Sequence, residues 1–137
     1  MIEYVKCKKI VGGIGTGRIV YTKYPLNFLS SVDTHTGVVS DPSHDLIGIS
    51  LKNSILIFPY AIGSSVGAYS IFALKSNGVA PSGIICTIKV DSTTASGCAI
   101  AGIPLAQTFK GDQLQGLSDN FEAILDANNG SLKINKV

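Results

Sequence analysis

The chain has 137 residues, which is the length of one domain, since domains typically run to about 100–150 residues. Its 45% of hydrophobic residues and its formal net charge of +2 exclude a disordered tail. Basic residues cluster only at Lys6-Cys7-Lys8-Lys9, which is too small a patch for nucleic acid, so we expect no nucleic-acid partner.

The first 50 residues are rich in loops. The β-branched and aromatic run at residues 18–22 predicts a strand, and another short strand is expected at residues 47–49. The preceding Gly13-x-Gly15-x-Gly17 superficially resembles a dinucleotide-binding motif. That motif opens a helix, whereas a strand follows here, so the glycines indicate a close backbone contact. Polar turns are expected at residues 33–37 and 41–45.

The second half alternates between strands and helices. Apolar runs at residues 54–58 and 83–88 predict strands that are covered on both faces, and helices are expected at 66–75 and from the Asp91 cap to about 101. A strand-like piece follows at 103–105, and a hairpin with an Asn-Gly turn is expected at 121–134. This order predicts an α/β fold: a central, mostly parallel sheet with flanking helices and β-rich ends.

Charge is scarce in the middle of the chain. Only Lys75, Lys89 and Asp91 are charged between Asn53 and Phe109. The uncharged residues 53–74 are numerous enough to cross a bilayer, but Pro59 and a Gly/Ser cluster interrupt them, so we expect no membrane span. Solvated surfaces are usually charged, and the stretch therefore predicts a buried core together with a face against a partner protein.

Cysteine usage and the N-terminus bear on location and cofactors. Three cysteines, an odd number without CxxC spacing, favour neither a disulfide framework nor a self-contained metal or iron–sulfur site. The first six residues lack the apolar core of a signal peptide, so a cytoplasmic protein is expected. His35 and His44 lie near Asp33, Asp41 and Asp45, but such residues more often close turns, and we expect no metal there.

The sequence Gly63-Ser64-Ser65 is the main candidate site. It lies where a buried strand ends and a helix begins, where backbone N–H groups favour an anion and a serine hydroxyl could transfer a proton. The alternative is that both serines only cap the helix. Gly63-x-Ser65-x-Gly67 also has the form of a hydrolase nucleophile elbow, but both histidines precede the serine, which argues against that class.

Four blocks of sequence together resemble the small swivel component of the aconitase X family. They are residues 25–37, with a Val-Asp-x-x-Thr-Gly turn, residues 41–48, with His-x-Leu, then Gly63-Ser64-Ser65, and residues 77–81, with Gly-x-Ala-Pro. The resemblance spans about residues 11–106. It implies a swivelling β/β/α domain over residues 1–137, as the small subunit of a heteromeric hydro-lyase.

The resemblance also implies a reaction and a partner. The family members that this chain most resembles are archaeal, and their reaction removes water from (R)-5-phosphomevalonate to give trans-anhydromevalonate 5-phosphate in isoprenoid biosynthesis. A large aconitase X type subunit would hold an iron–sulfur cluster, and this chain would bind no cofactor alone. The phosphorylated hydroxy acid would be the only small-molecule partner.

By position, the family's serine base corresponds to Ser64, with Ser65 as the alternate. Gly63, Ser65, Asp33 and Thr36 would contact the substrate. The chain departs from the family pattern at Ser30-Ser31, where two glycines are usual, and at Asp45, where a proline is usual. These departures leave two alternatives: a dehydratase for another hydroxy acid, such as a hydroxyproline, or a swivel or binding module without catalytic activity.

Overall fold

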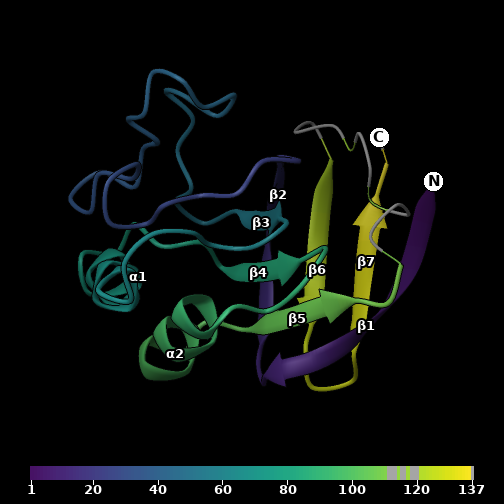
Figure 1. Ribbon diagram of the computed structural model, residues 1–137. Coiled ribbons are helices and arrows are strands. Elements are labelled where there is room, and N and C mark those ends of the chain that lie inside the picture. The colour runs from purple at the N-terminus through teal and green to yellow at the C-terminus, as the bar shows by residue number, and fades with distance from the viewer. Residues whose placement is uncertain (111–113, 115–116, 118–120, 137) are drawn as a thin grey trace.

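A computed structural model describes residues 1–110, 114, 117 and 121–136. Within these residues seven strands form a closed barrel in the order β1-β5-β4-β3-β2-β6-β7, and two helices lie beside it (Figure 1). The elements are β1 (Ile2–Val11), β2 (Ile14–Tyr21), β3 (Ile55–Phe58), α1 (Gly67–Ser76), β4 (Gly83–Cys86), α2 (Ser92–Ala101), β5 (Leu105–Thr108), β6 (Glu122–Asp126) and β7 (Ser131–Asn135).

The expected fold class is wrong, because the sheet is neither mostly parallel nor flanked by helices on its two faces. Strands β2, β3, β4 and β5 pair in parallel, but β1 pairs antiparallel with both β5 and β7, and β2 pairs antiparallel with β6. The β-rich ends of the chain therefore close the parallel strands into a mixed barrel. The second face of the parallel strands is covered by the interior of the barrel and not by a second layer of helices. Both helices lie on one side (Figure 1).

The apolar strands β3 and β4 are buried on both faces, as their sequences predict. Ile55, Ile57 and Ile85 point into a core enclosed by the barrel. Leu56 and Phe58, one residue out of phase, belong to a second core between the barrel and the helix layer. Because successive side chains of a strand alternate between its faces, a strand between two cores is apolar throughout.

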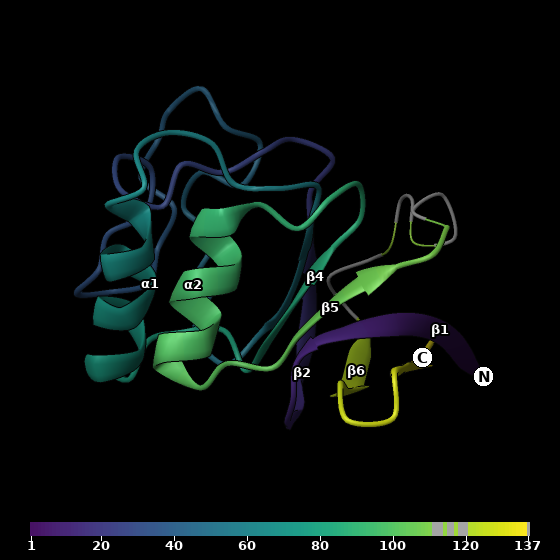
Figure 2. The same cartoon turned by 60° about the horizontal axis from the view of Figure 1, so that its bottom comes forward.

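The two predicted helices are confirmed and lie side by side (Figure 2). Asp91 caps α2 by accepting the Thr94 N–H at 2.9 Å. A Cβ on Gly97 would lie 2.7 Å from Ile71 Cδ1, so the small residues of α2 allow α1 to approach closely. A Cβ on Gly67 would lie 3.1 Å from Thr93 Cγ2, which shows that the two helices begin next to each other.

Residues 22–54 form a layer of turns. The predicted short strand at 47–49 is absent from the described residues, and only isolated bridges such as Val32 to Val39 occur in this layer. The predicted close contact of the glycines is confirmed, because Cβ atoms on Gly15 and Gly17 would collide with the backbone carbonyls of Ser82 and Asn53. The sequence pattern of residues 2–11 did not predict a strand there. In β1 buried and exposed residues alternate only in part.

Candidate functional site

Gly63, Ser64 and Ser65, the serine loop, connect the end of β3 to the start of α1. Gly63 has φ of 96°, which favours glycine, and a Cβ there would collide with the side chain of Asn27. Asn27 in turn accepts the backbone N–H groups of Leu29 and Ser30, at 3.1 and 3.2 Å. The loop therefore lies in a fixed position against residues 27–30.

Both serine side chains are exposed, but their environments differ. Ser64 Oγ accepts the backbone N–H of Val66 at 3.2 Å, so the residue just before α1 donates to this hydroxyl. Ser65 lines a groove of ≈ 440 Å³ between the two helices. Val66 occupies the N-cap position of α1 and no side chain caps it, so the alternative interpretation, in which both serines cap the helix, is wrong. The Val66 N–H would stabilise negative charge developing on Ser64 Oγ.

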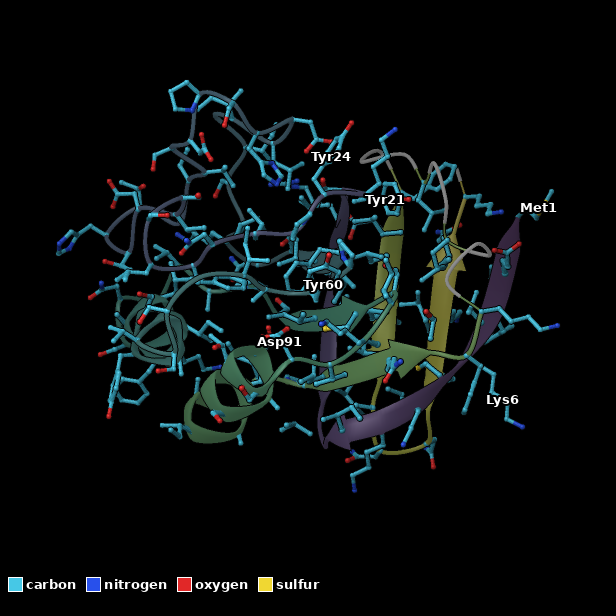
Figure 3. The ribbon with its side chains drawn as sticks, viewed as in Figure 1. Met1, Lys6, Tyr21, Tyr24, Tyr60 and Asp91 are labelled. Atoms are coloured by element: carbon cyan, nitrogen blue, oxygen red, sulfur yellow. The ribbon has the colours of Figure 1, made fainter. Side chains whose placement is uncertain are left out.

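Asp91 links the segment that precedes the serine loop to the start of α2. Its Oδ1 accepts the Ala61 N–H at 2.8 Å, while both carboxylate oxygens accept from Thr94. In Figure 3 Asp91 lies close to Tyr60, the neighbour of Ala61, at the boundary between helices and barrel. The hydrogen bonds of Asp91 hold the start of α2 beside the loop that leads to α1.

Lys89 and Tyr60 belong to the same edge, and the sequence hypothesis did not include them. Lys89 Nζ lies 4.9 Å from the centre of the Tyr60 ring, a cation–π arrangement. The ion pairs found among the described residues are His44 with Asp45 and Lys136 with Glu3, and neither involves Lys89. The low charge count of residues 53–109 is the sequence signal that could have singled out this exposed cation.

Asp33 and Thr36 lie at the other end of α1. The Asp33 carboxylate accepts the N–H groups of His35 and Thr36 at 2.8 and 3.2 Å, and these hydrogen bonds lower its pKa. In the same turn, the Thr34 carbonyl accepts a hydrogen bond from the side-chain amide of Asn77, which lies just beyond α1. A helix of 10 residues is about 15 Å long. The structure therefore does not bring Asp33 and Thr36 together with the serine loop.

The two departures from the family pattern have local structural roles. Asp45 Oδ1 accepts the Thr22 hydroxyl at 2.7 Å, which joins the end of β2 to the layer of turns. Ser31 is buried and donates to Asp41 at 3.3 Å, whereas Ser30 is exposed close to Asn27 and the serine loop. The change at Ser30 is therefore the one that lies near the candidate site.

The residues of this chain do not fit an iron–sulfur cluster. Among residues 1–110, 114, 117 and 121–136, no three His, Cys, Asp or Glu side chains gather where they could hold a metal ion. Cys7, Cys86 and Cys98 are buried, and burial raises their thiol pKa values, to about 11 for Cys7 and about 12 for Cys98. Thiols of this kind do not readily become the thiolates that cluster irons bind.

Comparison with known proteins agrees with this geometry. The fold is a mixed barrel with two helices on one side, and serines are exposed where the first helix begins. The family described as "Aconitase X swivel domain" matches residues 4–134, and the chain belongs to this family. In the described part of the chain, the helices are too short or too polar to cross a membrane.

Similar proteins carry consistent names. The "Phosphomevalonate dehydratase small subunit" of Thermococcus gammatolerans is 39% identical, with 93% of this chain and 94% of the relative covered. That of Methanothermobacter thermautotrophicus is 38% identical, with 94% and 98% covered. The crystal structure of aconitase X from Thermococcus kodakaraensis, in its holo-form, superposes with a TM-score of 0.89 at 36% identity, covering 98% of this chain and 99% of that one.

Proposed function

We propose that this chain is the small subunit of a phosphomevalonate dehydratase, a hydro-lyase of the archaeal mevalonate pathway. The substrate is (R)-5-phosphomevalonate and the product is trans-anhydromevalonate 5-phosphate. The relatives named above support this activity, and the exposed serine loop of this chain supplies a matching proton-transfer site.

Ser64 acts as the general base in this proposal. Its Oγ takes a proton from the carbon adjacent to the substrate carboxylate. Ser64 acts here as the alkoxide, and the electron pair of that C–H bond forms the new double bond while hydroxide leaves the neighbouring carbon. The proton taken up by Ser64 passes to the hydroxide, which is released as water, and Ser64 returns to the alkoxide. The observation that carries the assignment is the hydrogen bond from the Val66 N–H to Ser64 Oγ, because the start of α1 stabilises an anionic oxygen. Ser65 is the alternate base.

The chain acts as one swivel domain over residues 1–137 in the cytoplasm, and only with a large subunit. The iron–sulfur cluster belongs to that subunit, since the buried thiols of this chain are unsuited to it. Gly63 and Ser65 contact the substrate beside Ser64. Contact with Asp33 and Thr36 stays a prediction, and it requires a part of the substrate or of the large subunit that reaches the far end of α1.

The test is to co-express both subunits anaerobically and to measure dehydration of 5-phosphomevalonate. We expect Ser64→Ala to lower the rate by about 10²–10⁴-fold, the usual contribution of general base catalysis. Ser65→Ala removes a substrate contact but leaves the proposed base in place, so it is expected to lower the rate much less than Ser64→Ala does. The isolated small chain is expected to be inactive. Full activity of Ser64→Ala with loss in Ser65→Ala would exchange the two roles, and an inactive wild-type complex would contradict the substrate.

A second candidate is a dehydratase of the same family that acts on another hydroxy acid. Ser30 favours it, because this departure from the usual glycine lies next to Asn27, whose side chain contacts Gly63. Assaying the same complex with hydroxyproline and other hydroxy acids distinguishes the two substrates. A complex that forms but dehydrates none of them would be a binding module without catalytic activity.

A further inference from the structure

The two helices present an apolar surface without charge. Val66, Tyr69, Phe72 and Ile100 form this helix face, and their side chains are 47%, 73%, 45% and 63% exposed. Lys75, in the last turn of α1, is the only charged residue of the two helices. Contiguous apolar surface of this kind is uncommon on a protein that acts alone, and it usually marks an interaction site.

The helix face is continuous with the serine loop. The groove of ≈ 440 Å³ between the helices is lined by Tyr69, Phe72 and Ile100, and also by Ser65. Because Ser65 follows Ser64 directly, one end of this groove lies next to the residue that bears the proposed base. A protein that covers one of them therefore comes close to the other.

We propose that the helix face is the surface on which the large subunit docks, an inference that rests on the proposed function. The described residues of this chain bring a proton-transfer group but no metal-binding group, so the large subunit has to approach the serine loop. From there the uncharged groove leads away between α1 and α2. The docking surface of the large subunit is therefore apolar and uncharged where it meets these helices.

Separate exposed apolar side chains on the barrel provide a comparison. They are Ile2, Tyr4 and Ile14, at 52%, 68% and 63%, and a smaller hollow of ≈ 200 Å³ lies beside Ile2. Charged Glu122 and Lys133 line that hollow, unlike the groove of the helix face. Ile2 and Tyr4 belong to β1 and Ile14 to β2, and in Figure 2 β1 and β6 lie on the side of the molecule away from the helices.

Two matched pairs of substitutions separate these surfaces. Tyr69→Glu and Ile100→Glu place a carboxylate on the helix face, and Tyr4→Glu and Ile14→Glu place one on the barrel at nearly equal exposure. Affinity for the purified large subunit of the same organism is measured by sedimentation, after thermal unfolding shows that each variant is folded. We expect the helix-face variants to bind at least tenfold more weakly and the barrel variants to bind like wild type.

Each other outcome overturns the proposal. Wild-type affinity of folded helix-face variants, or equal weakening by the barrel variants, would show that the large subunit docks elsewhere. Self-association through Tyr69 and Ile100 that persists when the large subunit is bound would assign the face to a second copy of this chain. Failure of the proposed function would give another result. The wild-type complex would form and the helix-face variants would weaken it, but the complex would not dehydrate 5-phosphomevalonate.

Discussion

Three charged side chains lie between Asn53 and Phe109, and each has a different environment. The Asp91 carboxylate is occupied by the N–H of Ala61 and by Thr94. Lys75 lies in the last turn of α1, at the end of the helix that is farther from the serine loop. Lys89 stacks on Tyr60 at the edge where the serine loop begins. The substrate proposed above carries two anionic groups, a carboxylate and a phosphate, and Lys89 is a cation on this edge for one of them.

Replacing Lys89 by Met tests this role in the assembled enzyme. A hydrogen bond to a charged group contributes about 1.5–3 kcal/mol, so Lys89→Met should lower kcat/KM about tenfold or more, mostly through a higher KM. Lys75→Met removes an equal charge from the far end of α1 and should leave both constants unchanged. An equal loss in the two variants would indicate a general effect of net charge and contradict a contact with the substrate.

At the scale of elements, local sequence was sufficient to predict both helices, the Asp91 cap of α2, the C-terminal end of α1 and the position of Gly63-Ser64-Ser65. It did not predict the start of α1, where Val66 rather than a serine is the N-cap residue. The Asp91 cap and the Asn77-Gly78 end are local signals, and the structure has them where they were expected. Contacts between elements were not predictable in this way. The approach of Lys89 to Tyr60 joins two loops that are 29 residues apart, and the separation of Thr36 from Ser64 depends on the packing of residues 33–37 near Asn77.

The packing of the two helices leads to a prediction in which two effects oppose each other. Gly97→Ala raises helix propensity by about 1 kcal/mol, but the new Cβ would lie 2.8 Å from Ile71 Cβ, an atom that cannot move without its helix. Overpacking of this kind costs about 1–3 kcal/mol. We therefore expect a net decrease in the free energy of unfolding of about 1 kcal/mol, measured by urea denaturation.

Ser96→Ala is the control for this substitution, because Ser96 is exposed on the same helix. It should leave the unfolding free energy unchanged or raise it slightly, since alanine has the higher helix propensity. If Gly97→Ala stabilised the protein as much as Ser96→Ala does, the close approach of α1 and α2 would be contradicted.

At the scale of the whole molecule, the sequence pattern predicted the parallel strands but not the barrel that they help to form. Closure depends on pairing between the two ends of the chain, where Ile2 lies opposite Asn135 and Cys7 opposite Thr108. Pairing over more than 100 residues leaves no local signal. The apolar run at residues 54–58 correctly predicted a strand buried on both faces. The same run would be expected whether the second face packs inside a barrel or against a second layer of helices, so the sequence did not distinguish the two.

Closure of the barrel also requires β2 to pass very close to the segments that enter β3 and β4. Gly17 faces the Asn53 carbonyl and Gly15 the Ser82 carbonyl, in each case without room for a Cβ. Gly17→Ala forces backbone atoms apart, and we expect it to lower the free energy of unfolding by about 1–3 kcal/mol in urea denaturation. Thr16→Ala, on the exposed face of the same strand, should change it by less than about 1 kcal/mol. Equal stability of the Gly17 and Thr16 variants would mean that β2 leaves room for a side chain where it crosses these segments, and that the barrel closes less tightly than its pairing indicates.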